Sequence, residues 1–380
     1  YKRQAEQHAK LALLCDKLNY QAFLNIGLIA QLRHQYDQAL IAFNQALELN
    51  PNYADALSNK GITLHALHQY DQALIAFNQA LELNPNHLES LYNKGITLNA
   101  LKRYPEEVGC YRNILKESST FPFLLGSYLH AKRLTCDWED SNNQTLNNIT
   151  EKILSEIATT PPFASLSFSD DTSLHLQAAQ LWANTHFPEN TDLGPLPAYP
   201  KQQKLRIGYF SADLHNHATG VLMAQLFELH NREQFEVYAF SYGPDYQDAM
   251  RKRLTKSFDQ FIDVRMRSDK EIAQLSRELK IDIAIDLKGY TQGGRTGIFA
   301  YRAAPIQINY LGYPGSMGAP YIDYIIGDPI VIPESSKQHY SEKIIYLPHT
   351  YQVNDSLRKI SDRIFTRSEC GLPESGFIFC

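Results

Sequence analysis

Several polar side chains that can transfer protons fall together in one short segment of the sequence. Asp213, His215, Asn216 and His217 all lie within residues 211–219, Ser-Ala-Asp-Leu-His-Asn-His-Ala-Thr. A neutral imidazole accepts a proton near pH 7, and a nearby carboxylate orients the ring for that task. Two histidines also suit a metal ion, but no third ligand lies at a suitable spacing, so we predict no metal site. The alternative is structural, because a histidine in a loop more often serves only as a hydrogen-bonding partner.

Two further segments are rich in glycine. They are Lys-Gly-Tyr-Thr-Gln-Gly-Gly-Arg at 288–295 and Leu-Gly-Tyr-Pro-Gly-Ser-Met-Gly-Ala-Pro at 311–320. Glycine has no Cβ atom, so it lets the backbone approach a ligand closely. Arg295 either faces a phosphate group or caps the helix that follows it, and both roles stay open at this point. No GxGxxG follows a strand and no GxxxxGK[ST] occurs, which argues against dinucleotide-binding and P-loop chemistry.

These segments need a scaffold, and the sequence around them predicts a parallel sheet. Runs rich in Ile, Val, Tyr and Phe predict strands at 205–211, 235–241, 260–264, 281–287 and 306–311. Helical stretches alternate with the strands, and Ser268 with Glu271 predicts a capping box on the stretch at 268–280. This alternation favours a Rossmann-like sheet, in which the working residues occupy loops after the carboxyl ends of strands. All three polar segments hold that position.

The first third of the chain has a different pattern, an internal repeat. The segment HQYDQALIAFNQALELNPN occurs at 34–52 and again, unchanged, at 68–86, and NKGITL occurs at 59–64 and at 93–98. Both recurrences have a period of 34 residues, the length of a tetratricopeptide (TPR) helical hairpin. We therefore predict units near 17–50, 51–84 and 85–118, within a repeat domain at 1–120.

The residue types in these units fit two helices that cross closely. Gly61 and Ala73 are small where the helices meet, and Phe77 is expected to pack against the next unit. The third unit departs from this pattern, because Glu107 and Tyr111 take the places of Ala73 and Phe77. A unit of this kind serves either as a cap or as the junction with the next domain.

The rest of the sequence divides into three parts. Residues 121–200 predict an irregular helical region and residues 201–365 the Rossmann-like lobe, and residues 366–380 form a closing segment, which the family resemblance described below implies to be the start of another lobe. The closing run Gly-Phe-Ile-Phe-Cys at 376–380 is apolar and typical of a strand. The predicted fold is a multidomain α plus α/β protein, with a TPR α-solenoid in front of a Rossmann-like lobe.

Composition argues against several functions. A formal net charge of −5 disfavours a general nucleic-acid binder. No apolar run approaches the roughly 20 residues that a membrane-spanning helix needs. The five cysteines are scattered and form no CxxC pair, as expected for reduced thiols in the cytoplasm. We therefore expect a cytoplasmic protein that contacts neither nucleic acid nor a membrane.

Taken in order, the loops resemble the amino-terminal catalytic lobe of the TPR-containing protein O-GlcNAc transferase and SPINDLY-like family, in its bacterial form. The resemblance runs through LRIGYFSADLHNHATGVLM, IDIAIDLKGYTQGGR and YRAAPIQINYLGYPGSMGAPYIDYIIGD, and it extends to GLPESGFIFC at the end. It implies a GT-B architecture, of which the Rossmann-like region is the N-terminal lobe. It also implies an inverting transfer of GlcNAc from UDP-GlcNAc to Ser or Thr of proteins, with no metal and no cofactor.

The resemblance assigns roles to the loop at 211–219. Asp213, Asn216, His217 and Thr219 match the active-site loop of the family. The family's counterpart of His217 lies near the donor sugar and the acceptor, so His217 acts either as a general base or as a group that orients substrate. Asp213 is expected mainly to orient a loop or a histidine. In-line attack by a weak hydroxyl nucleophile makes such positioning valuable.

A second set of residues, Leu311, Gly312 and Pro314, matches the tight turn that flanks the donor in the family. One family residue is missing, because a histidine that animal members place near the site falls close to Phe163 here. The run that closes this sequence opens the second lobe in the family, and that lobe supplies the nucleotide pocket. The sequence is therefore expected to be truncated before its second lobe and to bind donor poorly.

Two alternatives to GlcNAc transfer fit the same pattern. The first is a non-catalytic TPR scaffold with a degenerate lobe, whose partner binding survives the loss of His217. The second is a protein O-fucosyltransferase that uses GDP-fucose, as SPINDLY-type relatives do. The segment GYPGSMGAP is closer to the GlcNAc branch. We therefore favour UDP-GlcNAc as the donor, with proteins or peptides held by the repeats as acceptors.

Overall fold

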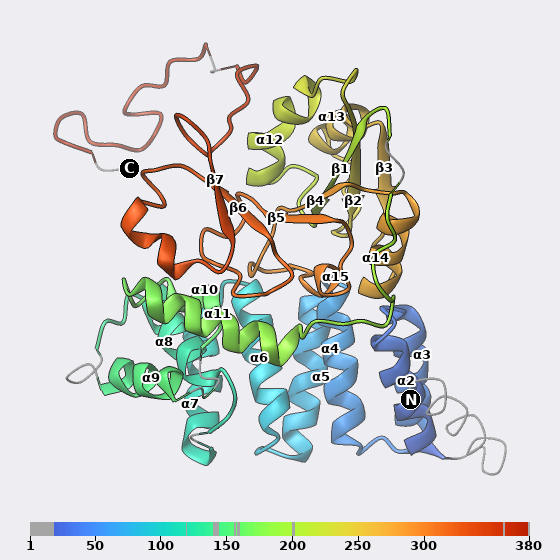
Figure 1. The fold of residues 1–380 in the computed structure, drawn as a ribbon. Helices are drawn as coiled ribbons and strands as arrows, with labels where there is room; N and C mark the ends of the chain where they lie inside the picture. Colours follow the sequence, from blue (N-terminus) through green and yellow to red (C-terminus); the bar gives the residue numbers. More distant parts are fainter. Residues whose placement is uncertain are drawn as a thin grey trace.

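The structure is a computed structural model with two halves of different architecture (Figure 1). It describes residues 19–118, 120–139, 144–155, 157, 160–199, 202–359 and 362–378. Helices form the first half, and a parallel sheet with flanking helices forms the second. The predicted combination of a helical solenoid with a Rossmann-like lobe is confirmed. Residues 1–18 of the predicted repeat domain lie outside the described residues.

Consecutive helical hairpins form the repeat region. Their helices are α2 Tyr20–Gln31 and α3 Tyr36–Leu49, α4 Ala54–Ala66 and α5 Tyr70–Leu83, and α6 Leu88–Ala100 and α7 Tyr104–Glu117. Each hairpin turns through a residue with a positive φ, namely His34, His68 and Lys102. These residues have the spacing of the sequence repeat, so the turn geometry recurs together with the sequence.

The two helices of each hairpin meet at a glycine. A Cβ atom on Gly61 would lie 2.6 Å from the ring of Phe77, and one on Gly27 would lie 2.3 Å from the ring of Phe43. Both rings are fully buried, and a close-packed interior leaves no room for an added carbon. Phe77 was expected to pack against the next unit, but its ring fills the space over Gly61 in its own hairpin, and Leu40 of the preceding unit packs against its cluster.

The third unit joins the repeats to the helical region that follows. Tyr111 takes the aromatic position, with its ring 2.4 Å from the place of a Cβ on Gly95. Tyr111 and Ile114 are buried in one cluster with Leu124 of the next helix. The helices of this region are α8 Leu124–Leu134, α9 Gln144–Leu154, α10 Pro162–Ser165 and α11 Thr172–His186. The departures from the repeat pattern therefore mark a junction and not a free cap.

Parallel strands form the sheet of the second half, in the order β3-β2-β1-β4-β5-β6-β7. They are β1 Leu205–Ser211, β2 Phe235–Ser241, β3 Gln260–Asp263, β4 Ile283–Asp286, β5 Ile306–Asn309, β6 Tyr324–Gly327 and β7 Lys343–Tyr346. The first five coincide with the predicted strands, and β6 and β7 are additions. The strand order reverses between β1 and β4, which is where sheets of this kind bind ligands.

Helices cover both faces of the sheet. On one face, α12 Ala218–Leu229 and α13 Ala249–Ser257 bury Phe227 and Leu254. On the other, α14 Asp269–Glu278 and α15 Gly297–Ala300 bury Ile272 and Phe299. The predicted capping box at Ser268 is present on α14. A 3-10 helix, η2 Glu334–His339, precedes β7.

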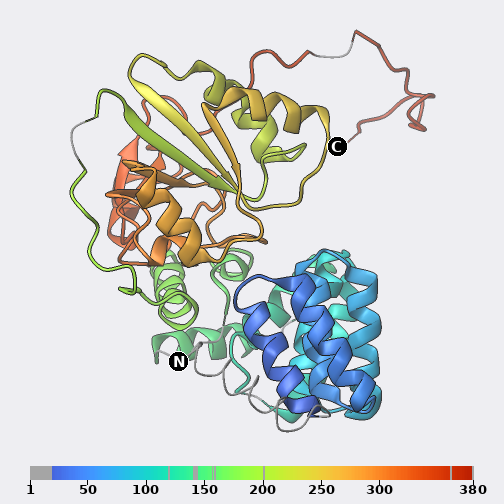
Figure 2. The same ribbon diagram turned by 90° about the vertical axis from the view of Figure 1, so that its right-hand side faces the viewer.

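The repeats lie beneath the α/β half, on the side of α14 and α15 (Figures 1 and 2). The linking helix α11 packs under the sheet domain, where the Tyr321 hydroxyl donates to the Phe187 carbonyl at 2.8 Å. At the other end of the solenoid, Tyr36 of α3 lies near α14. Burial raises the pKa of the Tyr36 hydroxyl, the charge of Arg295 lowers it and that of Asp269 raises it. The lobe is therefore approached both by the end of the linking helix α11 and by α3 of the first hairpin.

The end of the chain differs from its prediction. The described residues 362–378 contain neither helix nor strand. Phe377 is 83% exposed, and residues 376–378 belong to no strand. The strand expected at 376–380 is therefore wrong for its described part, since a strand needs a partner to satisfy its backbone, and the last two residues lie outside the described ones.

Candidate active site

The three polar segments meet at the carboxyl ends of neighbouring strands. They follow β1, β4 and β5, which are paired side by side. The third segment touches the second, because a Cβ atom on Gly312 would lie only 2.9 Å from Cα of Lys288. The site therefore straddles the boundary where the strand order reverses.

Asp213 is the buried carboxylate of this site, with a side chain only 10% exposed. Its Oδ2 accepts a hydrogen bond from Nζ of Lys288 at 2.7 Å, and the Lys288 side chain is 8% exposed. The backbone N–H of Asp213 donates to Oγ of Ser211 at 2.9 Å, which fixes the turn after β1. The ion pair ties the loop after β1 to the loop after β4. Lys288 opens the segment 288–295 and directly follows the strand predicted at 281–287, but its pairing with Asp213 was not predicted from the sequence.

His217 is the N-cap residue of α12. Its Nδ1 accepts a hydrogen bond from the backbone N–H of Thr219 at 3.2 Å and lies 3.5 Å from Oδ2 of Asp213. The His217 side chain is 43% exposed, so a substrate can reach the ring from solvent. The structure thus brings together three of the residues singled out in the sequence.

His215 and Asn216 occupy the same loop and face different neighbours. The ring centroid of His215 lies 4.7 Å from that of Tyr246 and 5.8 Å from that of His217. Burial lowers the pKa of His215, which favours a neutral ring. Asn216 donates its backbone N–H to Oδ2 of Asp248 at 3.1 Å. Its side chain is exposed, so Asn216 can contact a substrate while its backbone is held in place.

A buried arginine of α13 holds the loop from behind. Arg251 donates to the carbonyl of Leu214 at 3.2 Å and to Oγ of Ser241 at 2.6 Å. Its guanidinium lies 4.4 Å from the ring centroid of Phe261. Burial lowers the pKa of Arg251, and the charge of Asp245 raises it. No sequence motif points to Arg251, because its partners lie on other elements of the fold.

Buried polar residues at the strand ends support the other two loops. Oδ1 of Asp286, the last residue of β4, accepts the backbone N–H of Lys288 at 2.9 Å, and its Oδ2 has no partner within the described part of the chain. Burial raises the pKa of Asp286 to about 6. Asn309, the last residue of β5, donates from Nδ2 to the Tyr313 carbonyl at 3.1 Å. Both side chains hold the start of a loop in place.

The third segment turns tightly after β5, where the backbone N–H of Gly312 donates to the Tyr310 carbonyl at 2.8 Å. Leu311 has a φ of 66°, an unusual conformation for a residue with a branched side chain. Gly312 lies against Lys288, since a Cβ atom there would approach its Cα to 2.9 Å. Pro314 is exposed, and its carbonyl accepts a hydrogen bond from the Tyr340 hydroxyl at 3.3 Å. Gly312 is therefore the member of this set that adjoins the buried ion pair.

Arg295 holds the second loop against α14. Its Nε donates to Oδ1 of Asp269 at 2.7 Å, and another nitrogen donates to the Arg267 carbonyl at 2.8 Å. Arg295 therefore joins the second loop to α14, and the N-cap residue of the helix that follows is Thr296.

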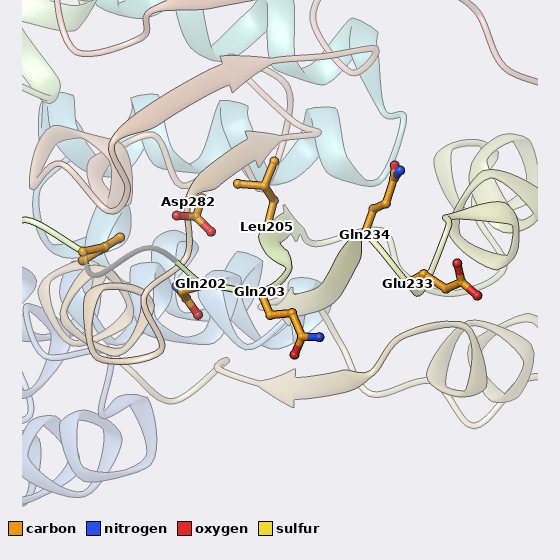
Figure 3. Close-up of a pocket in the computed structure, with 7 residues that line it drawn as sticks. Gln202, Gln203, Leu205, Glu233, Gln234 and Asp282 are labelled. Carbon is orange, nitrogen blue, oxygen red and sulfur yellow. The ribbon is translucent and has the colours of Figure 1, made fainter.

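A pocket of about 370 Å³ lies elsewhere, at the amino ends of the strands (Figure 3). It is lined by Tyr199, Gln202, Gln203, Leu205, Glu233, Gln234 and Asp282. This is the opposite end of the sheet from the polar loops, so the pocket is separate from the candidate site. The described residues hold no group of three or more His, Cys, Asp or Glu arranged for a metal ion. Within the same residues, no helix is long and apolar enough to cross a membrane.

Comparison with known families matches both halves of the chain. The family described as glycosyl transferase family 41 matches residues 186–380, which include the whole sheet and the candidate site. Tetratricopeptide repeat families match residues 20–53, 54–87 and 76–108.

Individual relatives agree with these families. A probable UDP-N-acetylglucosamine–peptide N-acetylglucosaminyltransferase, SEC of Arabidopsis thaliana, is 36% identical over 66% of this chain and 28% of its own length. A Caenorhabditis elegans UDP-N-acetylglucosamine–peptide N-acetylglucosaminyltransferase is 35% identical over 44% of this chain and 15% of its own. The solved structure of a mutant O-GlcNAc transferase from Thermobaculum terrenum aligns with a TM-score of 0.58 and 25% identity, over 88% of this chain and 58% of that one. The chain thus spans less than a third of the length of these two curated relatives.

Proposed function

Because the chain belongs to glycosyl transferase family 41, we propose that it carries the repeat arm and one catalytic lobe of a protein O-GlcNAc transferase. The reaction transfers N-acetylglucosamine from UDP-GlcNAc to the hydroxyl of Ser or Thr in proteins, with inversion at the sugar and without a metal cofactor. The observation that carries the proposal is the placement of Asp213 and His217 where the strand order reverses. The names of the relatives support the choice of sugar.

The proposed chemistry depends on positioning. A hydroxyl is a weak nucleophile, so its in-line approach to the sugar needs fixed partners on the protein. His217 offers a reachable ring whose orientation is set by the helix N-cap contact with Thr219. Asp213 is buried and paired with Lys288, so it acts through its neighbours and not by contact with substrate. Gly312 lets the third loop approach this pair closely.

The repeats are proposed to bind the protein or peptide acceptor. One hairpin reaches the neighbourhood of the active-site loop, because Tyr70 at the start of α5 interacts with Tyr246. Burial raises the pKa of the Tyr70 hydroxyl, and Tyr246 raises it further. Tyr246 in turn contacts the ring of His215. An acceptor held along the hairpin turns therefore lies near His217.

We further propose that the reaction takes place in the cytoplasm. Three described cysteines, Cys110, Cys136 and Cys370, are free thiols, as is usual in a reducing compartment. Fractionation of cells that express the tagged gene product tests this point, and recovery in an oxidising compartment would contradict it.

The product of the complete gene, incubated with radiolabelled UDP-GlcNAc and a protein extract as acceptor, tests the function. We expect label on Ser and Thr of proteins and little label from GDP-fucose in a parallel reaction. Label from GDP-fucose alone would replace the proposed donor. No label from either donor, with any length of the gene, would overturn the proposal and leave a TPR scaffold.

A further inference from the structure

The Nδ1 atom of His217 has two neighbours that make opposite demands on it. The backbone N–H of Thr219 lies at 3.2 Å and needs Nδ1 as an acceptor. Oδ2 of Asp213 lies at 3.5 Å and needs Nδ1 to carry a proton. In a neutral imidazole only one of the two nitrogens carries the proton. The contact that prevails at Nδ1 therefore decides what the other nitrogen, Nε2, offers to a substrate.

The two outcomes give His217 different chemistry. If Nδ1 accepts from Thr219, the proton resides on Nε2, and the ring offers a hydrogen-bond donor. If Nδ1 donates to Asp213, Nε2 is bare and can take a proton as a general base. Pairing of a histidine Nδ1–H with a carboxylate is the arrangement that prepares a base in hydrolases. The question at this site is therefore which partner Asp213 prefers.

Lys288 is the nearer partner of Asp213. Its ammonium group lies 2.7 Å from Oδ2 of Asp213, much closer than Nδ1 of His217 does to the same oxygen. Side-chain exposures of 8% for Lys288 and 10% for Asp213 leave little water to screen the pair. Charge-assisted hydrogen bonds of this kind are about twice as strong as neutral ones. Lys288 thus takes the short, strong contact with Oδ2, whereas the 3.5 Å separation from Nδ1 of His217 exceeds the usual range of a hydrogen bond.

The start of α12 acts in the same direction. A helix N-terminus carries backbone N–H groups without helical partners, and an N-cap side chain satisfies one of them. His217 performs this function through Nδ1. The other ring in the loop, that of His215, lies 5.8 Å from the ring of His217 between centroids, at an interplanar angle of 62°. Among the described residues, the contacts around the ring thus favour an unprotonated Nδ1.

We infer that Lys288 is a positioning residue which, by holding Asp213, keeps His217 in the Nε2–H form. In that form His217 donates a hydrogen bond to an oxygen of the substrate, and it does not remove the proton of the acceptor hydroxyl. The meaning of this state for catalysis rests on the proposed function, but the state of the ring does not. Lys288 itself lies against Gly312 of the third loop with a side chain only 8% exposed, so its effect on substrate passes through Asp213 and His217.

The state of the ring is measured by NMR on the 380-residue chain labelled with ¹⁵N-histidine, and the His217 signals are assigned by their loss in His217→Gln. We expect the wild-type chain at pH 8 to show the proton on Nε2. Lys288→Met frees the Asp213 carboxylate, so the proton is expected to move to Nδ1. Lys288→Arg keeps a cation beside Asp213 and is expected to match the wild type. Lys337→Met, which removes a lysine from the exposed pair with Glu334, is the matched control and is expected to change nothing at His217.

Folding of the variants is controlled by a double substitution. If Lys288→Met unfolds because it leaves Asp213 buried without a cation, Lys288→Met with Asp213→Asn removes both charges and is expected to fold with the proton on Nε2. A wild-type chain with the proton on Nδ1 would overturn the inference directly. So would a folded Lys288→Met chain whose His217 signals match those of the wild type.

Transfer by the complete gene product gives a second readout. Lys288→Met is expected to lower kcat about tenfold or more with little change in the KM for UDP-GlcNAc. The reason is that the variant loses the hydrogen-bond donor on Nε2 of His217, and the loss of such a donor weakens binding of the transition state most. Lys288→Arg is expected to restore most of the rate, and a loss of rate equal to that of Lys288→Met would contradict the role assigned to the cation. A gene product without any transferase activity would refute the proposed function, while the NMR result would still stand.

Discussion

The repeat region and the α/β lobe of this chain are built on opposite principles. In the repeats, the decisive contacts are apolar and local, as between Gly61 and Phe77 of one hairpin. In the lobe, the decisive contact is an ion pair between Asp213 and Lys288, which are 75 positions apart. A local apolar contact can be weakened one unit at a time, whereas a buried ion pair leaves an unpaired charge when either member is lost. The two halves should therefore respond differently to substitution.

The largest effect is expected in the lobe. Asp213→Ala leaves the Lys288 ammonium buried without a partner, which costs roughly 3–5 kcal/mol in the free energy of unfolding. Chemical denaturation followed by hydrogen exchange in each half is the measurement, and the loss should appear in the lobe and not in α2 to α5. Asp192→Ala removes an exposed partner of Lys270 and should change stability by less than about 1 kcal/mol. Equal losses of unfolding free energy in Asp213→Ala and Asp192→Ala would contradict the importance of the buried ion pair for the stability of the lobe.

The next largest effect is a pH dependence of stability that is expected from Glu107 in the third repeat. Glu107 is 3% exposed at the position that Ala73 holds in the second repeat. Burial raises the pKa of Glu107 from 4.5 to about 7, and the hydrogen bond from Asn99 lowers it. The folded protein therefore holds this proton more tightly than the unfolded chain does. Stability is lost as the pH rises from about 4.5 to about 7, and the loss stays constant above that range.

Glu107→Gln should remove this pH dependence. At roughly 1.4 kcal/mol per pKa unit, the wild-type loss amounts to about 3 kcal/mol at pH 8. Urea denaturation at pH 5 and pH 8 measures it: the variant should gain on the wild type between the two values. A difference between variant and wild type that stays the same at both pH values would refute the assignment.

A smaller effect is expected at the hairpin crossing. Gly61→Ala places a carbon 2.6 Å from the ring of Phe77, and overpacking of this kind costs about 1–3 kcal/mol. Better helix propensity returns up to ~1 kcal/mol of that. Gly109→Ala in α7 is the matched control, because nothing lies within 4 Å of its Cβ. Thermal denaturation should show Gly61→Ala destabilised and Gly109→Ala unchanged or stabilised, and the reverse order would disprove the crossing contact.

The smallest effect is expected from removal of metal ions. Oδ2 of Asp213 is already occupied by Lys288, so the proposed reaction draws on no metal held by this carboxylate. Transfer assayed with the complete gene product should keep its rate in EDTA. A loss of rate that Mg²⁺ or Mn²⁺ restores would contradict this part of the proposal.

The same contrast governs what the sequence could predict. The repeats can be predicted from the sequence because identical segments recur with a fixed period, and this period is typical of helical hairpins. β1 and β2 match their predicted bounds because each is a seven-residue run of strand-forming side chains. β6 and β7 were not predicted, although they have four residues each, the same length as β3, β4 and β5.

The candidate site was predictable only in part. Asp213, His217 and Thr219 stand close together in the sequence, so a local pattern and a family resemblance both point to them. Lys288 and Arg251 meet that loop only through the fold, across separations of 75 and 37 positions. The strand expected at 376–380 also depends on contacts that the local sequence does not contain, because an apolar run becomes a strand only when another strand pairs with it.

The central claim is that the loop after β1 forms the active site of a sugar transferase. Transfer from UDP-GlcNAc by the complete gene product carrying His217→Ala tests it most directly. We expect kcat/KM to fall by roughly 100-fold or more, while His230→Ala, at the far end of α12, keeps most of the wild-type rate. Wild-type activity in His217→Ala, or an equal loss in both variants, would contradict the claim.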